Sequence, residues 1–200
     1  MAFDFHTLLA SEKAQNTPPS QTARWVLPLF HATKGPVLDL GCGNGRDSLY
    51  FFEQGLQVVA VDIDAEAIGR LALKAEFECL VADALNLPFR EFSFDAIYSF
   101  GLLHVFTESI EENRQQVLDE AWRVLKPGGI AVFTALWTDI PGCGLPELCC
   151  LTEAEVEQLV ARSPFELMSK QIVNDHSLTG WEGIYWRLVL RKQKRVQIIK

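Results

Sequence analysis

The sequence predicts an α/β fold, a doubly wound and mostly parallel sheet of seven strands with helices on both faces. Segments typical of buried strands alternate with segments typical of amphipathic helices, which is the pattern that parallel sheets require. The first predicted strand, Val37–Leu40, runs directly into the turn Gly41–Gly45, which has glycine at three of its five positions. The 200 residues suffice for one well-filled domain of this kind and are too few for two.

The predicted strands are short apolar segments that follow one another along the whole chain. We expect them at 37–40, 58–62, 78–81, 95–98 and 130–136, with two more near 166–171 and 183–190. Helical patterns separate most of them, so the strands of this series are expected to pair in parallel through crossover connections.

Capping signals mark the helices between these strands. Asp64 is positioned to cap the helix that follows the second strand. Ser109–Glu112 and Thr152–Glu155 have the spacing of capping boxes, in which a hydroxyl and a carboxylate satisfy the first amides of a helix. Pro127–Gly129 predicts a sharp end to the helix that starts after Ser109 and a return to the sheet.

Three segments lie outside this alternation and divide the single domain 1–200 into regions. Residues 1–35, with helical patterns interrupted by Pro18, Pro19 and Pro28, are expected to form an N-terminal helical lid that is mobile around residues 1–20. Residues 36–138 are expected to form the cofactor-binding core, and residues 139–200 a substrate loop, a helix and the last two strands. The lid and the loop at 138–151 can reach the carboxyl ends of the strands, where such sheets bind ligands. Whether residues 172–182 also reach these strand ends depends on the direction of the last two strands.

The glycine-rich turn and the acid that ends the next strand predict an adenosine-containing ligand. Glycines let the backbone approach a ligand closely, and the helix that follows directs its first amides at it. Asp62 follows Gly45 by 17 positions, close to the spacing of an acid that binds a ribose. Arg46 occupies the place where a dinucleotide-binding turn has its third glycine. A nicotinamide-dependent oxidoreductase is therefore the less favoured interpretation.

The order of motifs from Val37 to Leu136 resembles that of the class I S-adenosylmethionine-dependent methyltransferases. The matching segments are Asp-Leu-Gly-Cys-Gly-Asn-Gly at 39–45, Asp62, Val81–Ala84, Phe94–Ser99 and Leu125–Gly129. The loop Gly-Cys-Gly-Asn-Gly-Arg-Asp-Ser is similar to small-molecule methyltransferases of the tellurite-resistance and thiopurine type. The resemblance implies a Rossmann-like methyltransferase fold with S-adenosyl-L-methionine as cofactor.

The resemblance also implies which residues bind the cofactor. They are Asp39, Gly41, Cys42, Gly43, Asp62, Ile63, Asp83, Ala84, Ser99 and Phe100. Asp62 would accept hydrogen bonds from both ribose hydroxyls, and Ile63 would pack under the adenine. Asp83 would accept from the adenine amino group while the Ala84 amide donates to a ring nitrogen. A turn-forming aspartate is the alternative for Asp83.

The methionine portion of the cofactor would lie against the bare backbone of the glycine loop. Asp39 would act near its ammonium group, or else brace the turn. Arg46 would meet its carboxylate, or else stay solvated. Ser99 and Phe100, at the end of the fourth strand, would border the methyl-bearing sulfur.

The implied reaction is an in-line displacement at a sulfonium methyl group, in which the protein aligns the nucleophile and excludes water. His104, five positions after Ser99, is the candidate general base. Packing where the strand gives way to a helix is the alternative for this histidine. A non-catalytic adenosyl-binding or regulatory domain is the alternative for the whole chain, because methyl transfer has no obligatory catalytic residue.

Charge and composition favour a small-molecule acceptor over a nucleic acid. The net charge is −8, and six of the 18 basic residues lie in the last 14 positions, which leaves an acidic body. Such a surface is a poor footprint for a polyanion. The basic residues at the end are expected to form a solvated terminus. Ser99–Leu102 also lacks the Asn/Asp-Pro-Pro-Tyr/Phe motif of enzymes that methylate the amino groups of adenine or glutamine.

The sequence also lacks the signals of secretion, membrane insertion and disulfide bonding. No signal peptide and no apolar run long enough for a bilayer is visible, so we expect a cytoplasmic protein without a membrane partner. Five cysteines, an odd number, argue against a disulfide framework. No metal site is expected. Cys143, Cys149 and Cys150 are expected to form a structural loop, and capture of a soft metalloid is the alternative.

Overall fold

A single sheet forms the centre of the molecule in this computed structural model, which describes residues 16–140 and 148–194 together with positions 11, 14, 142, 144 and 145. The strand order is β3-β2-β1-β4-β5-β9-β8. The strands are β1 Val37–Leu40, β2 Val58–Asp62, β3 Glu78–Val81, β4 Phe94–Phe100, β5 Leu125–Leu136, β8 Glu166–His176 and β9 Glu182–Arg191. The first five pair in parallel, and β9 and β8 complete the sheet antiparallel. This architecture confirms the predicted fold class.

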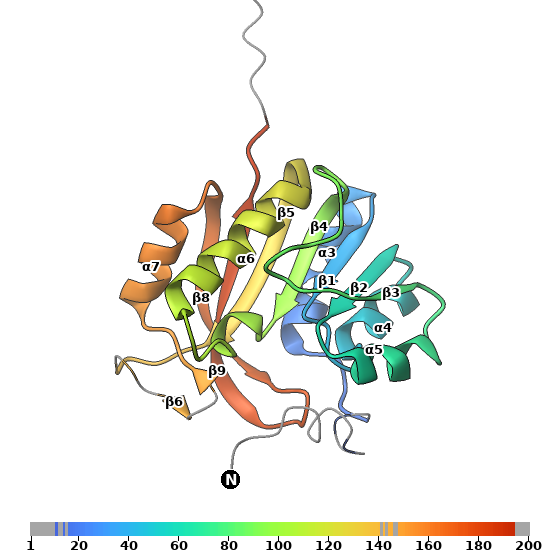
Figure 1. The fold of residues 1–200 in the computed structure, drawn as a ribbon, viewed down its shortest axis with the longest axis horizontal. Coiled ribbons are helices and arrows are strands. Elements are labelled where there is room, and N and C mark those ends of the chain that lie inside the picture. The colour runs from blue at the N-terminus through green and yellow to red at the C-terminus, as the bar shows by residue number, and fades with distance from the viewer. Residues whose placement is uncertain are drawn as a thin grey trace, which may run out of the picture.

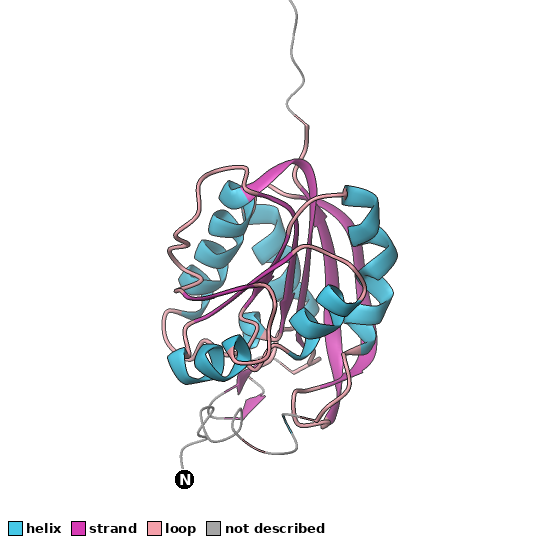
Figure 2. Ribbon diagram, turned by 90° about the vertical axis from the view of Figure 1, so that its right-hand side faces the viewer, coloured by secondary structure: helices cyan, strands magenta, loops and turns pink. Residues whose placement is uncertain are grey.

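Helices cover both faces of the sheet, so that the molecule has three layers (Figure 2). The helices are α3 Gln21–Thr33, α4 Arg46–Glu53, α5 Ala65–Ala72, α6 Ile110–Val124 and α7 Glu153–Arg162, with the short turn η1 Leu102–His104. One core lies between the sheet and α6 and α7, and the other two lie between the sheet and the α3, α4 and α5 layer. In Figure 1, α6 lies in front of the sheet, and the strands β1 and β4 end at the lower edge. We call this edge, where the carboxyl ends of the parallel strands lie, the ligand edge.

The structure differs from the prediction in two places near the end of the chain. The segment 172–182, expected as a loop, largely continues β8, which pairs with β9 as far as His176↔Glu182. Only the turn Ser177–Trp181 separates the two strands. Because β9 runs antiparallel to β5, this turn lies at the ligand edge. A two-stranded sheet, β6 Gly144–Leu145 with β7 Leu148–Cys149, occurs within the expected substrate loop.

The two predicted capping boxes had different outcomes. Thr152 and Glu155 form the reciprocal bonds of a capping box at the start of α7. Ser109 precedes α6, but its φ is +43° and its side chain makes no capping bond. The box fails there because a left-handed backbone does not place the hydroxyl over the first amides of the helix. Asp64 caps α5 as expected, by accepting from the amides of Glu66 and Ala67. The helix before Pro127–Gly129 ends at Val124, because β5 already begins at Leu125.

The helix α3 is part of the hydrophobic core. Ala23, Val26 and Phe30 are fully buried, and the Phe30 ring lies 5.6 Å from Phe51 and 6.3 Å from Tyr98 in edge-on contacts. The helix also continues through Pro28, which was expected to interrupt it. The expected lid therefore cannot include residues 21–33, and we restrict that hypothesis to the segment before Ser20. Most of residues 1–15 lie outside the described part of the chain.

Two carboxylates from distant segments hold the N-terminus of α3. Asp175 of β8 is buried and accepts hydrogen bonds from the Gln21 amide at 2.9 Å and from the Thr22 amide and hydroxyl at 2.8 and 2.7 Å. Asp47 of α4 accepts from the amide and hydroxyl of Ser20, each at 2.9 Å. These bonds satisfy amides that have no partner within the helix, and negative charge is favourable at this end of a helix.

Three of the four basic residues that the structure describes at the C-terminal end pack into the fold, while Lys194 is exposed as expected. Arg187 is buried with its guanidinium 3.7 Å from the Trp25 ring centre, and Arg191 forms an ion pair with Glu166 at 2.9 Å. Lys192 is buried against the rings of Phe92 and Trp122. The expectation of a solvated terminus was wrong for these three, because their aliphatic stems and charges pack into the fold.

The Asp175→Asn substitution should measure how strongly α3 is attached. An asparagine keeps the size of the side chain but offers one accepting oxygen to donors that now share a carboxylate. We expect the free energy of unfolding to fall by about 2 kcal/mol in denaturant titrations. The matched control is Glu166→Gln, which breaks a half-exposed ion pair and should cost about 0–1 kcal/mol. Equal losses in the two variants would contradict the assigned role of Asp175.

Candidate functional site

The glycine loop between β1 and α4 has a backbone that only glycine adopts without strain. Gly41, Gly43 and Gly45 have φ values of +74°, +55° and +78°. A Cβ atom on Gly45 would lie 2.3 Å from the Leu71 side chain of α5. The amides of Gly41 and Cys42 both donate to the Val61 carbonyl, at 2.9 and 3.0 Å, and hold the loop against β2. The loop therefore presents bare backbone at the ligand edge.

Asp62, the last residue of β2, holds this loop in place. One carboxylate oxygen accepts from the Gly43 amide at 2.7 Å, and the other accepts from the Asp64 amide at 2.9 Å. Burial raises the pKa of this half-buried carboxyl, although the hydrogen bonds from the backbone act to lower it. A carboxylate has about four acceptor sites, so Asp62 retains capacity for a diol.

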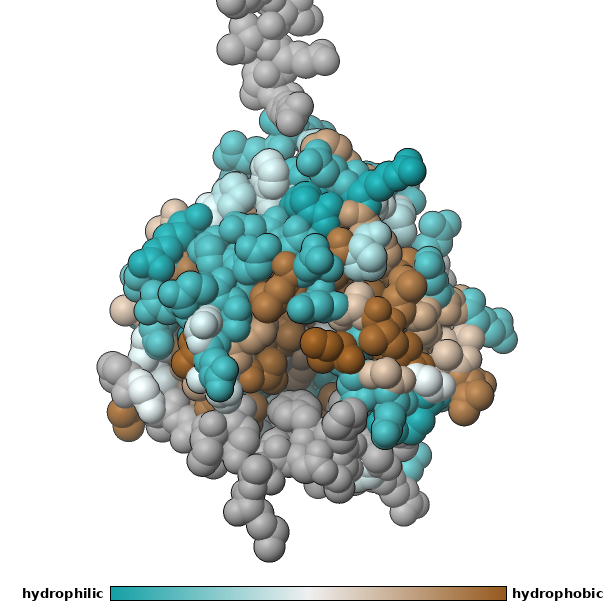
Figure 3. All heavy atoms as spheres, in the orientation of Figure 1, coloured by the Kyte–Doolittle hydropathy of each residue, from teal (hydrophilic) through white to brown (hydrophobic). Residues whose placement is uncertain are grey.

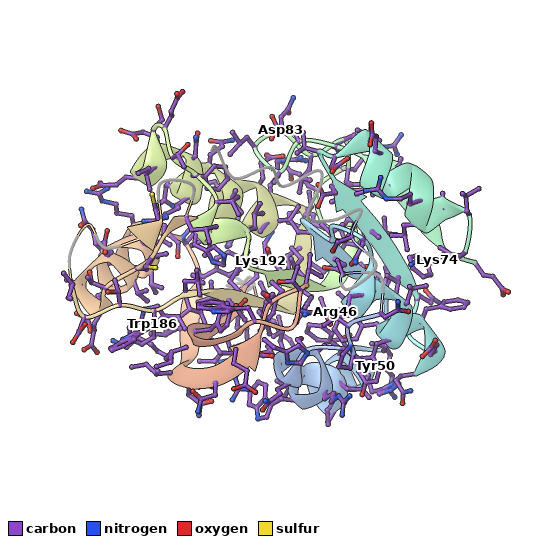
Figure 4. All side chains as sticks on the ribbon, turned by 90° about the horizontal axis from the view of Figure 1, so that it is seen from below. Arg46, Tyr50, Lys74, Asp83, Trp186 and Lys192 are labelled. Carbon is purple, nitrogen blue, oxygen red and sulfur yellow. The ribbon has the colours of Figure 1, made fainter. Side chains whose placement is uncertain are left out.

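Ile63 follows Asp62 at the end of β2, and Asp83 and Ala84 follow the end of β3, the strand that pairs with β2. The Ala82 amide donates to the Asp62 carbonyl at 2.9 Å, which joins the ends of β2 and β3. Ile63 is 71% exposed, an unusual position for a large apolar side chain next to the loop. Asp83 is exposed and accepts from the Leu85 amide at 2.9 Å, so it also forms the turn that was its alternative role. Asp83 lies at the periphery of the ligand edge, while Arg46 lies near its centre (Figure 4).

A narrow hollow lies on the other side of the glycine loop. Its lining residues are Asp39, Gly41, Cys42, Arg46, Asp47, Phe100 and Leu178. Asp39 is buried and accepts a short hydrogen bond from the Ser48 hydroxyl. Burial raises the pKa of Asp39 to about 7, against the lowering effect of the Ser48 hydrogen bond. A carboxyl in this state can bind a cation only by giving up its proton.

Arg46 is neither solvated nor free for a ligand. Its guanidinium donates to both carboxylate oxygens of Asp47, at 2.9 and 2.8 Å, and to the His176 carbonyl at 3.0 Å. It also lies 4.8 Å from the centre of the Phe100 ring. Burial acts to raise the pKa of Asp47, yet the Arg46 charge and the hydrogen bonds bring it below its ordinary value. The expected carboxylate-binding role of Arg46 is therefore replaced by an internal ion pair.

Ser99 and Phe100 have different surroundings. The Ser99 side chain is fully buried, and its hydroxyl donates to the Leu40 carbonyl at 2.8 Å. This bond joins β4 to β1, so the hydroxyl has a structural role. Phe100 lines the hollow. Of the two residues expected beside the sulfur, only Phe100 presents its side chain there.

His104 is held by the backbone in η1. Its Nδ1 atom accepts from the Leu136 amide at 3.0 Å, and the side chain is buried. Burial lowers the pKa of His104 to about 3, and the nearby Arg114 adds to this effect. A neutral imidazole with one nitrogen already engaged fits the packed histidine that the sequence left as the alternative.

Sequence reasoning did not find the long-range partners of this site. Ser20, Asp47 and Tyr98 form a buried cluster, and Leu178 reaches the hollow from the β8–β9 turn. None of these pairings has a local sequence signal, because the partners lie far apart along the chain. Asp47 next to Arg46 was the one visible hint of an ion pair.

The expected loop cysteines are only partly described. Cys143 lies outside the described residues, while Cys149 and Cys150 are half-buried. Arg114 donates to the Cys149 carbonyl at 2.6 Å and so fixes the backbone there. Among the described residues, no three metal-ligating side chains lie together. In the same part of the chain, no helix combines the length and the apolar character that crossing a bilayer requires.

Comparisons with known proteins agree with this geometry. Residues 38–133 match the family model described as a methyltransferase domain. The chain carries a class I methyltransferase domain. The matched residues contain the glycine loop, Asp62, Asp83 and β4, which are the parts of the site described above.

The curated proteins similar to this methyltransferase domain do not share one named activity. An uncharacterized methyltransferase of Synechocystis sp. is 36% identical over 114 residues, which cover 55% of this chain and 52% of that protein. The tRNA (carboxymethyluridine(34)-5-O)-methyltransferase of Arabidopsis thaliana is 39% identical over 103 residues, covering 49% of this chain and 23% of that protein. The chain thus spans about half the length of the first relative and about a quarter of the second.

One solved structure similar to this methyltransferase domain contains ligands. It is the 1,6-didemethyltoxoflavin-N1-methyltransferase of Burkholderia thailandensis, with bound 1,6-didemethyltoxoflavin and S-adenosylhomocysteine. The TM-score is 0.66 at 26% sequence identity, and the match covers 87% of this chain and 79% of that one.

The Gly45→Ala substitution should show how tightly the loop is packed. Gly55 offers a matched control, since its φ of +83° is similar but a Cβ atom there would meet nothing within 4 Å. Gly55→Ala should cost about 1–2 kcal/mol of unfolding free energy from backbone strain alone. Gly45→Ala should cost about 1–3 kcal/mol more, because the new methyl group collides with Leu71. Calorimetric unfolding of both variants makes the comparison. Equal losses of unfolding free energy would mean that Leu71 and α5 move aside without loss of stability.

Proposed function

We propose that this chain transfers a methyl group from S-adenosylmethionine to a small-molecule acceptor by in-line displacement. The observation that supports the proposal most strongly is the glycine loop held by the carboxylate of Asp62. A loop of bare backbone next to an acid at the end of the second strand suits a nucleoside without phosphate groups. The cytoplasmic location expected from the sequence belongs to the same proposal.

The residues beside β2 and β3 suit the adenosine half of the cofactor. Asp62 has acceptor capacity left after its two backbone bonds, which fits the two hydroxyls of a ribose. The exposed Ile63 offers an apolar surface for an adenine ring. Asp83 and the Ala84 amide would bind the edge of the base.

The residues around the narrow hollow suit the methionine half. Gly41, Cys42 and Gly43 would contact it through the backbone. Asp39, in its ionised form, would balance the positive charge of an amino group. When bound, the cofactor supplies a methyl group that its sulfonium already activates. Phe100 and Leu178 would exclude water from that group and leave an opening toward the acceptor side.

Surface charge favours a small acceptor over a nucleic acid. A tRNA-modifying relative and a solved relative with a small bound acceptor are both similar to this chain, so similarity alone does not decide. The net charge of −8 disfavours a polyanion. Arg187, Arg191 and Lys192, half of the six basic residues at the C-terminal end, are engaged within the fold.

The acceptor class can be tested by following the product of the cofactor. Purified protein with S-adenosylmethionine should form S-adenosylhomocysteine when given small thiols, amines, hydroxyls, carboxylates or chalcogen oxyanions, compound by compound. Unmodified tRNA is included in the same panel. Turnover with tRNA alone would reverse the choice of acceptor. Binding of the cofactor without turnover on any compound would favour the non-catalytic adenosyl-binding alternative.

The Asp62→Ala substitution tests the cofactor. It removes two charge-assisted hydrogen bonds to the ribose, each of about 1.5–3 kcal/mol, so affinity for S-adenosylhomocysteine should fall more than about tenfold in calorimetry. Because Asp62 also holds the loop, thermal unfolding is measured in parallel, with Asp64→Ala, which removes the carboxylate that caps α5, as the control. Wild-type protein that binds NAD and not S-adenosylhomocysteine would refute the cofactor assignment.

The Asp39→Asn substitution tests the methionine half through its pH dependence. Because the pKa of Asp39 is raised to about 7, its carboxyl group carries a proton when the pH is well below 7. The carboxyl group must lose this proton before it can pair with a cationic amino group. Affinity for S-adenosylhomocysteine should therefore rise between about pH 5 and pH 8, with its midpoint near 7. Asp39→Asn should bind more weakly and lose this slope, whereas the exposed Asp119→Asn should keep it. A wild-type affinity that is flat over this range would remove Asp39 from the ammonium site.

A further inference from the structure

The two buried tyrosines, Tyr98 and Tyr185, differ in what their hydroxyl groups contact. The Tyr98 hydroxyl contacts Asp47 at 2.9 Å and Ser20 at 2.8 Å, as a buried phenol normally does. Tyr185 is only 2% exposed, yet its hydroxyl has no hydrogen-bond partner in the described part of the chain. Among the described residues, the fully buried polar atoms without a partner do not include this hydroxyl, so it keeps contact with solvent. A ligand that covers the hydroxyl removes that contact and must offer an accepting atom in its place.

Tyr185 stands where the cofactor region meets the substrate loop. It lies near the start of β9 and pairs with Leu136, the last residue of β5, at the ligand edge. Its ring centre is 5.2 Å from that of Phe100, which lines the hollow beside the glycine loop, and 6.3 Å from that of His104. Hydrophobic residues border a hollowed area at this edge (Figure 3). A ligand that approaches Phe100 from the acceptor side therefore comes near this ring.

The charge state of Tyr185 limits what it can do. Burial raises its pKa well above the ordinary value of a tyrosine, and the Asp175 carboxylate adds to the increase. The phenol thus stays protonated at physiological pH and is a poor proton acceptor. Its remaining chemical capacity is to donate one hydrogen bond and to present an aromatic edge.

We propose that Tyr185 donates a hydrogen bond to the methyl acceptor and selects acceptors with an oxygen or nitrogen that can receive it. The inference rests on the proposed methyl transfer. The bound acceptor satisfies the unpaired hydroxyl, and compounds that lack an accepting atom leave it unpaired. A site built in this way discriminates strongly, because the wrong ligand gains no compensation for the desolvated donor.

The first test compares the stability of two matched variants. Tyr185→Phe removes a hydroxyl that has no partner, and its free energy of unfolding should equal or exceed that of the wild type. Tyr98→Phe removes a hydroxyl bonded to Asp47 and Ser20, and it should be clearly less stable. If Tyr185→Phe is destabilised as much as Tyr98→Phe, the hydroxyl has a structural partner and the inference is wrong.

The second test measures turnover with the most active compound from the panel described above. Tyr185→Phe should bind S-adenosylhomocysteine within about twofold of the wild type, while its kcat/KM falls by about 10- to 100-fold, chiefly through KM. Equal kcat/KM in the two proteins overturns the inference and leaves the proposed function intact. No turnover by the wild type on any compound overturns the proposed function, and this inference with it.

The third test reports contact directly. Labelling with 3-fluorotyrosine gives three fluorine resonances, which Tyr-to-Phe variants at 50, 98 and 185 assign. Addition of the same compound to the complex with S-adenosylhomocysteine should shift the Tyr185 resonance and leave that of Tyr50 unchanged. A Tyr185 resonance that does not respond to an acceptor known to turn over contradicts the contact.

Discussion

The carboxylate of Asp47 is the interaction on which the ligand edge depends. It receives hydrogen bonds from the Ser20 amide and hydroxyl, from Tyr98 and from the Arg46 guanidinium, so α3, β4 and α4 meet at one side chain. Through its third nitrogen, Arg46 extends the cluster to the His176 carbonyl of β8. A charge this deeply buried is tolerated only because it is paired and fully hydrogen-bonded. Loss of either partner would leave the other charge uncompensated in the core.

This cluster helps to explain how a loop with three glycines keeps a single conformation. Three alternating glycines with positive φ have little preference of their own for one conformation. The Arg46–Asp47 pair fixes the first turn of α4, Asp62 fixes the middle of the loop, and Val61 fixes its start. The flexibility that brings backbone close to a ligand is thus restrained from three sides, which is the preorganisation that a binding site requires.

Features that depend on neighbouring residues could be predicted from the sequence. The strands, the cap at Asp64 and the capping box at Thr152 follow from patterns within a few positions, and the structure has them. Ser109 has the same capping-box spacing as Thr152, but its backbone is left-handed and its side chain makes no capping bond.

Features that depend on tertiary contacts could not be predicted. The glycine loop and its acid were visible because they are coded locally, and the same holds for the exposed Ile63. Ser99 was assigned to the cofactor but bonds to Leu40, and Arg46 was assigned to a ligand but pairs with Asp47. Asp175 gave no signal as a cap, since its helix lies about 150 positions away in the sequence. In each case a partner from another strand or helix decides the role.

The reversed direction of β9 divides the site into two parts of the chain. In a purely parallel sheet, only the carboxyl ends of strands reach the ligand edge, whereas here the beginning of β9 and the turn before it reach it as well. The groups around the glycine loop come from residues 39–100, and Leu178 and Tyr185 come from a hairpin that follows the methyltransferase domain match. A change in the hairpin can alter what the site accepts while the donor half keeps its geometry. Exchange of residues 177–186 between related proteins would leave Asp175 and His176 in place to hold α3 and Arg46, and would change only the part of the hairpin that carries Leu178 and Tyr185.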